Sequence, residues 1–308
     1  MVFFAKKDKV RSWVEILIKT HFFRFIFFYL LIFGIIKSQE EHEIYIDPNK
    51  GDRIYRREGL MNGNQVETIM SNWGTIGRAS GHPYSAVWPR NTGHDHVSEM
   101  SLVVSGKVTS EGNQYTIVSE ALYGGEISSD GSTEWGWQPL PGYASTSLGQ
   151  DTLAINTRNK TWPDKWPGKD SNWNDNWNGY FGLGVENASM ECLYVSDDSK
   201  NAEFDFFPNP SDETMRGLGL QVETRMFQWV HPLAEDAIFV HYAVTNVGQV
   251  NYGYDNPIFF GMFADTHPGG NGSSDDDSYF DLDENMVYAW DHDNIGRWLT
   301  YTDILPGN

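Results

Sequence analysis

Three late stretches of the sequence alternate between two sets of side chains with a period of two, which is the spacing of a β-strand with one buried face. They cover residues 222–229, 238–245 and 258–264. Shorter runs of β-branched and aromatic residues, bounded by Gly, Asn, Asp and Pro, predict further strands. These lie at residues 101–108, 114–118, 151–155, 192–195, 203–207 and 286–290. Few stretches after residue 39 keep a helical period of 3.6, so the sequence predicts an all-β fold, an antiparallel two-layer β-sandwich with long loops.

The first 38 residues differ from the rest in charge and hydropathy. Six lysines and arginines lie within residues 1–24, and the run from Phe25 to Ile36 is uncharged and nearly all apolar. An apolar run of about 7 to 15 residues after a basic flank has the size of a secretory signal, whereas about 20 residues are needed to span a membrane. Ser38 is a small residue before a cleavage point at Gln39, while the bulky residues 22–28 favour an uncleaved anchor. We therefore predict an N-terminal hydrophobic helix in residues 1–38, a signal peptide or a signal anchor, with membrane contact only through residues 22–36.

The charge of the remaining chain favours export and excludes nucleic-acid binding. The whole chain carries 22 Lys and Arg against 42 Asp and Glu, and without residues 1–38 the balance is 15 against 40. A basic flank before an acidic body favours a cytoplasmic flank and an exported body. An acidic body also repels a phosphate backbone. Cys192 is the only cysteine, so the chain has no intramolecular disulfide, and export without disulfides favours a bacterial envelope.

The composition divides the exported part in two. Residues 39–64 are polar and charged and predict a linker, and residues 65–308 predict a β-rich domain. The sequence stops soon after the strand-like residues 297–302, which indicates a fragment truncated at the C-terminus.

An Asp-rich loop, residues 265–285, is the candidate metal site. Residues 226–296 contain no Lys or Arg but twelve carboxylates. Carboxylates this close repel one another unless they are solvated or share a cation, and calcium takes six to eight oxygen ligands. The spacing does not fit an EF-hand loop, and a solvated acidic loop is the alternative. We expect calcium as the cofactor and no organic cofactor. The expected ligands are Asp265, Asp275, Asp276, Asp277, Asp281 and Asp283.

A Trp-rich loop, residues 159–184, is the candidate ligand-binding segment. Aromatic platforms beside carboxylates are typical of a carbohydrate-binding cleft, although tryptophans also serve as loop packing. The expected ligand-binding residues are Trp162, Trp166, Trp173 and Trp177. His94 and His96 lie two apart but lack a third metal ligand, so a polar turn is the better interpretation. No nucleophile elbow, phosphate loop, dinucleotide fingerprint or His-Glu-x-x-His motif occurs, so we assign no catalytic residue, and the sequence leaves open whether the chain is an enzyme.

Several phrases of the chain resemble one family. They are SNWGTIG at 71–77, AVWP at 86–89, WNDNWNGYFG at 173–182, RGLGL at 216–220, YAVTNVG at 242–248 and GMFAD at 261–265. Together they resemble the N-terminal region of large exported proteins of Gram-negative bacteria that have no assigned function, many of which end in a type IX secretion sorting domain. The resemblance covers roughly residues 65–308 and implies export and a surface role without any chemistry. The expected sorting domain does not occur in this sequence, which supports truncation.

The sequence thus predicts a secreted or cell-surface protein of a Gram-negative bacterium with a structural or binding role, stabilised by calcium. The expected partner is an envelope or extracellular protein or a glycan. One alternative is a carbohydrate-binding or carbohydrate-active protein that uses the Trp-rich loop. Another is a domain held at the membrane by its uncleaved N-terminal helix.

Overall fold

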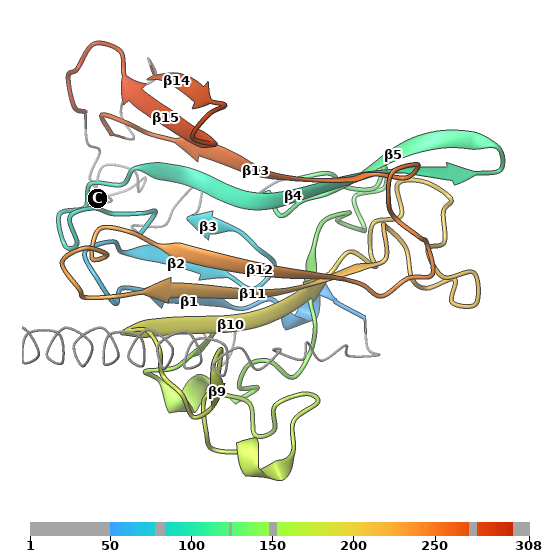
Figure 1. The fold of residues 1–308 in the computed structure, drawn as a ribbon, viewed down its shortest axis with the longest axis horizontal. Helices are drawn as coiled ribbons and strands as arrows, with labels where there is room; N and C mark the ends of the chain where they lie inside the picture. Colours follow the sequence, from blue (N-terminus) through green and yellow to red (C-terminus); the bar gives the residue numbers. More distant parts are fainter. Residues whose placement is uncertain (1–49, 78–83, 123–124, 148–152, 271–275, 298–308) are drawn as a thin grey trace, which may run out of the picture. The chain divides into compact units, whose positions relative to one another are not determined.

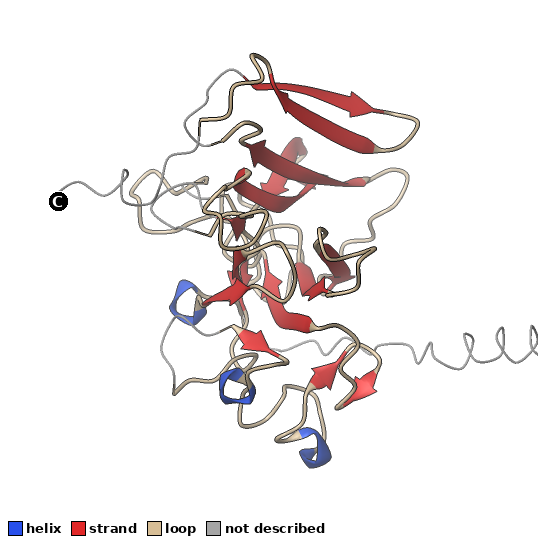
Figure 2. Cartoon of the chain, turned by 90° about the vertical axis from the view of Figure 1, so that its left-hand side faces the viewer, coloured by secondary structure: helices blue, strands red, loops and turns tan. Residues whose placement is uncertain are grey.

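The computed structural model describes residues 50–77, 84–122, 125–147, 153–270 and 276–297. These residues form antiparallel strands and three short 3-10 turns, η1 (Arg53–Tyr55), η2 (Asn159–Thr161) and η3 (Ser171–Trp173), as Figure 2 shows. The predicted all-β, antiparallel fold is therefore confirmed. The predicted N-terminal helix lies outside the described residues, and none of the helices within them is long and apolar enough to cross a membrane.

The first sheet has six strands in the order β1-β2-β3-β4-β13, with β5 also paired to β4 (Figure 1). Its long central strand β4 and strand β5 form a hairpin around Glu111 and Gly112, which both have positive φ, as a two-residue type I′ turn requires. The strands are β1 (Glu58–Met61), β2 (Thr68–Ser71), β3 (Ile76–Gly77), β4 (Val97–Ser110), β5 (Asn113–Ser119) and β13 (Ile258–Thr266).

The second sheet has five strands in the order β12-β11-β10-β6, with β7 also paired to β10. Every residue of β10 and β11 is buried, so both faces of this sheet are covered at its centre. Its strands are β6 (Gln138–Pro139), β7 (Ala154–Ile155), β10 (Met190–Asp197), β11 (Leu220–Gln228) and β12 (Phe239–Asn246).

Side chains from both sheets meet in two shared apolar clusters. One cluster joins Met70 of β2 and Ile76 of β3 to Cys192 of β10 and Met226 of β11. The other joins residues of β4 and β5 to Leu220 and other residues near the start of β11. Burial raises the pKa of the Cys192 thiol to about 12, so this cysteine serves packing and stays protonated. The core therefore lies between the two sheets.

Two smaller pairs of strands complete the described sheets. Strands β14 (Asp276–Asp281) and β15 (Met286–Asp291) form a separate hairpin, and β8 (Asn178–Gly179) and β9 (Gly182–Leu183) are short strands within the Trp-rich loop. The described residues other than 180–182 belong to one compact unit.

Two segments differ from the expectations. Residues 50–64, part of the predicted linker, contain β1, and the Gly51 N–H donates to Asp197 Oδ2 over 2.9 Å. Residues 203–207 form no strand, because the Arg216 guanidinium binds the carbonyls of Phe204 and Phe206, which a strand would use for pairing. The Phe204 ring instead stacks on Tyr115 at 4.7 Å.

Candidate functional site

The Trp-rich loop covers the second sheet on the side opposite the shared core. Cys192 and Tyr194 face that core, whereas Leu193 between them packs against Trp166 and Trp177. These two rings meet edge to face at 5.6 Å and are 0% and 1% exposed. Their indole N–H groups are satisfied inside the protein, by Asn176 O at 2.9 Å and Glu191 Oε2 at 3.0 Å. Two of the four predicted ligand-binding tryptophans are therefore core residues of this loop.

The other two tryptophans are half-buried. The Trp162 N–H donates to Ile155 O over 2.7 Å, and the Trp162 ring lies 5.6 Å from that of Trp177. The Lys169 ammonium lies over the Trp173 ring at 4.5 Å. The four rings thus do not form one open row, and a glycan would meet only Trp162 and Trp173 here. The carbohydrate interpretation remains a prediction.

A buried ionic network lies beneath the tryptophans, and no sequence pattern predicted it. Arg225 Nη1 lies 2.5 Å from Glu191 Oε1, and Arg225 Nε lies 2.9 Å from Glu223 Oε1. Arg225 Nη1 also donates to Asn178 O over 2.7 Å. Burial raises the pKa of Glu191, while the Arg225 charge opposes that rise. Because Arg225 and Glu191 are fully buried, the network serves to fasten the Trp-rich loop to the sheet.

The predicted calcium ligands lie on separate elements. Asp265 lies on β13 opposite Glu99 of β4, and Asp276 and Asp277 lie on β14. Asp281 Oδ1 accepts the N–H groups of Asp283 at 2.9 Å and of Glu284 at 3.1 Å, which closes the turn between β14 and β15. Asp275 lies outside the described residues.

The local partners of these aspartates are protein groups. Asp277 Oδ2 lies 2.7 Å from His292 Nδ1. Within the described segments, no three or more His, Cys, Asp or Glu side chains gather as a metal ion would require. His96 Nε2 lies 2.9 Å from Trp88 O, within a turn. Calcium binding stays a prediction, to be tested in solution.

Two adjacent carboxylates at the end of β10 were not anticipated. Asp198 accepts the Leu218 N–H at 2.7 Å, the Leu220 N–H at 2.8 Å and the Ser119 hydroxyl at 3.1 Å. Burial raises the pKa of Asp198 to about 7 despite these donors. The bonds tie β5, β10 and the start of β11 together.

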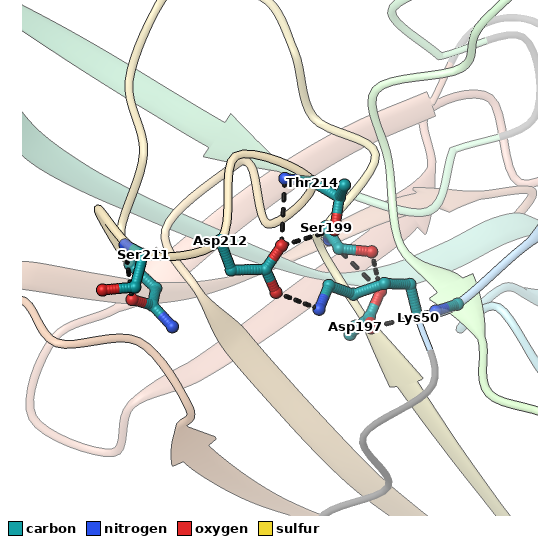
Figure 3. Close-up of polar contacts among 8 residues, drawn as sticks. Lys50, Asp197, Ser199, Ser211, Asp212 and Thr214 are labelled. Atoms are coloured by element: carbon teal, nitrogen blue, oxygen red, sulfur yellow. Dashed lines mark hydrogen bonds and ion pairs between the residues drawn. The ribbon is translucent and has the colours of Figure 1, made fainter.

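The neighbouring Asp197 is also buried, and Figure 3 shows its contacts with Ser199. Asp197 Oδ1 accepts the Ser199 hydroxyl at 2.7 Å, and burial raises the pKa of Asp197. Nearby, the Asp212 carboxylate lies between Thr214 and the Lys50 ammonium, 2.6 Å from Lys50 Nζ, and these bonds lower the pKa of Asp212 to about 2. The aspartates of this region thus anchor loops to the sheets.

A cleft of about 550 Å³ lies at the tip of the β4–β5 hairpin. Its lining comes from three segments far apart in the sequence, which explains why no local pattern marked it. Phe206, Phe207 and Pro208 supply much of its apolar lining, and Glu111 and Glu213 supply its carboxylates. The Arg216 guanidinium lies over the Phe207 ring at 4.5 Å.

Many of the exposed apolar side chains lie on β13, β14 and β15, and we call this set the aromatic surface. Its ten side chains are between 37% and 59% exposed. They are Phe259, Phe260, Met262, Phe263, Tyr279, Phe280, Met286, Val287, Tyr288 and Trp290. The sequence around them is acidic, because residues 226–296 contain no Lys or Arg. Aromatic side chains with nearby carboxylates suit the binding of a partner that carries both apolar and positively charged side chains.

No protein-family model, curated protein or solved structure matches this chain. The candidate site is therefore interpreted from its own geometry.

Proposed function

We propose that this chain is an exported β-sandwich protein, secreted or held at the cell surface, that acts by binding another macromolecule through the aromatic surface. The observation that carries this proposal is the exposure of the ten apolar side chains on β13, β14 and β15. Half-exposed side chains of this size offer on the order of 800 Å² of apolar area in total. These side chains point to both faces of their strands, so one face offers roughly half of that area, a few hundred Å², which is the size of an apolar patch that often serves binding on a soluble monomer.

The hairpin of β14 and β15 adds a second reason. An isolated two-stranded hairpin is at best marginally stable in water. Tyr279 and Tyr288 face each other on one side of this hairpin, and Phe280 and Val287 on the other. All four side chains are at least 44% exposed. A bound partner would cover them and stabilise the hairpin.

Binding is favoured over catalysis by the placement of the perturbed acids. Active sites are typically clefts that hold groups with shifted pKa values. Here the pKa values of Asp198 and Glu191 are raised, yet both side chains are completely buried. Burial also raises the pKa values of Glu120 and Glu203, but the cavity that Glu120 lines is only about 20 Å³. The basic, apolar N-terminal segment and the acidic body support export.

Site-specific photo-crosslinking in intact cells tests the binding proposal. A photoreactive phenylalanine analogue at Tyr288 is expected to form an adduct, because this side chain lies within the aromatic surface. The matched control is the same analogue at Ile127, which is 52% exposed on a loop between β5 and β6. Equal adduct yields at the two positions, or none at either, would contradict the proposal. Alkaline phosphatase fused after Asn308 tests export, since this reporter is active only outside the cytoplasm.

A further inference from the structure

The shared core is covered over β4 but open over β13. Residues directly opposite each other on neighbouring strands point to the same face of a sheet. Phe260 lies opposite Val104, and Met262 lies opposite Leu102, so all four side chains face the core. Val104 and Leu102 are 0% and 8% exposed, whereas Phe260 and Met262 are 59% and 45% exposed. The core-facing side of the first sheet is therefore covered by the second sheet at β4 but left exposed at β13.

The second sheet ends at β12, before it reaches β13. Tyr242 and Val244 of β12 pack against the cluster that contains Leu102 and Val104 of β4. β12 is the last strand of its sheet, and β4 and β13 lie above it in Figure 1. Neighbouring strands are about 4.8 Å apart. One further strand beside β12 would thus extend the second sheet toward Phe260 and Met262.

The edge of β12 that no described strand pairs with is suited to accept such a strand. Among the described strands, β12 pairs only with β11, and their register runs without a bulge from Phe239 to Asn246. An edge strand directs alternate N–H and C=O groups away from its own sheet. Protected edges usually carry Pro, Lys or a bulge, and the β12 sequence contains neither Pro nor Lys.

The negative charge of the sequence around β12 and β13 favours a positively charged strand. Residues 226–296, which include β12 and β13, carry twelve carboxylates and no Lys or Arg. This field attracts a positively charged segment and raises its association rate. A second copy of the chain, with a net charge of −20, would bring like charges together. The charge therefore favours a different, basic partner.

We propose that an extended segment of another protein, with apolar side chains at alternate positions and Lys or Arg between them, pairs with the edge of β12 that lies opposite its pairing with β11. Its inward side chains cover Phe260 and Met262, and its backbone adds one strand to the second sheet. This inference rests on the proposed binding function and narrows it to one kind of partner.

A synthetic nine-residue peptide of alternating Val and Lys, labelled with fluorescein, tests the proposal against the 308-residue chain by fluorescence anisotropy. We expect binding that weakens at least tenfold when Val–Glu replaces Val–Lys, or when alternate backbone nitrogens of the peptide are methylated. The variant Phe260→Ser is expected to weaken binding about tenfold. Ile127→Ser, which removes an exposed apolar side chain from the loop between β5 and β6, outside the aromatic surface, is the matched control and should change binding less than twofold.

Amide hydrogen exchange gives an independent readout of the strand pairing. Edge amides of β12 are expected to exchange rapidly in the free protein and slowly with the Val–Lys peptide. Equal affinity for Phe260→Ser and Ile127→Ser would overturn the proposal, as would tight binding of the methylated peptide. Slow exchange of the β12 edge amides in the free protein would also overturn the proposal, because it would show that the edge is already paired. Sedimentation would then identify the strand on β12: a dimer indicates a second copy of the chain, and a monomer indicates another segment of the same chain. Crosslinking at Tyr288 would still support the proposed function if the peptide failed.

Discussion

Replacing Arg225 with Met removes the guanidinium that binds both Glu191 and Glu223. The Met side chain fills much of the same volume but leaves two buried carboxylates without their counter-ion. Arg225 and Glu191 are completely buried, so water cannot compensate the loss. Breaking a buried ion pair on one side costs about 3 to 5 kcal/mol, and we expect this variant to lose that much unfolding free energy at pH 8.

The cost should fall at lower pH. Burial raises the pKa of Glu191 above its ordinary value, and removing Arg225 raises it further, because the guanidinium opposes the rise. A group whose pKa is higher in the folded state stabilises the fold fully below its unfolded pKa, and this contribution is lost as pH rises through the folded pKa. As the pH drops, the carboxyls of the folded variant therefore become protonated at a higher pH than those of the unfolded chain. The loss of unfolding free energy at pH 5 should thus be smaller than at pH 8.

Urea denaturation followed by circular dichroism at pH 5 and pH 8 measures both effects. The matched control is Arg297→Met, because Arg297 makes an exposed pair with Asp293 at 2.5 Å, and exposed i,i+4 pairs contribute only about 0.3 to 0.5 kcal/mol. A loss below about 1 kcal/mol for Arg225→Met, or a loss that is the same at both pH values, would refute the reasoning.

Three further predictions concern other parts of the molecule. Because burial raises the pKa of Asp198 to about 7, this carboxyl should make the unfolding free energy fall by up to about 4 kcal/mol as the pH rises from about 4 to 7. The Asp198→Asn variant should lose this decline. Urea titrations across the same pH range that show an unchanged decline in the variant would contradict the reasoning. Calcium at 100 times its Kd should add about 2.7 kcal/mol to the unfolding free energy, so a Tm that chelation leaves unchanged would remove the calcium prediction. Trp177→Ala should lower the unfolding free energy by about 3 to 5 kcal/mol and Trp173→Ala by much less, since of these two residues only Trp177 is fully buried. A polysaccharide pull-down with Trp173→Ala tests the glycan alternative, which fails if this substitution leaves binding unaffected.

Local patterns were sufficient to predict the long strands. The alternating residues 222–229, 238–245 and 258–264 correspond closely to β11, β12 and β13, because period two is a property of the strand backbone itself. Residues 203–207 were predicted as a strand by the same pattern and form a loop, since Arg216, which lies outside the segment, binds its carbonyls. Strand β1 was missed because Glu58–Met61 is short and is held by pairing with β2, a contact that the segment alone does not encode.

The candidate sites depended even more on distant contacts. Tryptophans at 162, 166, 173 and 177 look equivalent in the sequence, but the outer face of β10 buries two of them. The Asp-rich stretch was evident from composition, whereas the sites of individual aspartates on β13, β14 and the turn followed from strand pairing. Asp198 gave no signal, because its three donors come from β5 and from residues 218–220.

The sequence by itself determined which residues alternate, where turns interrupt them and how acidic the last third of the chain is, since these are properties of neighbouring residues. Only the tertiary structure decided which apolar faces are covered. Val104 and Phe260 lie opposite each other on one face of one sheet, yet the first is fully buried and the second is 59% exposed. The difference arises because burial depends on the strand that lies across the core, and the second sheet ends at β12.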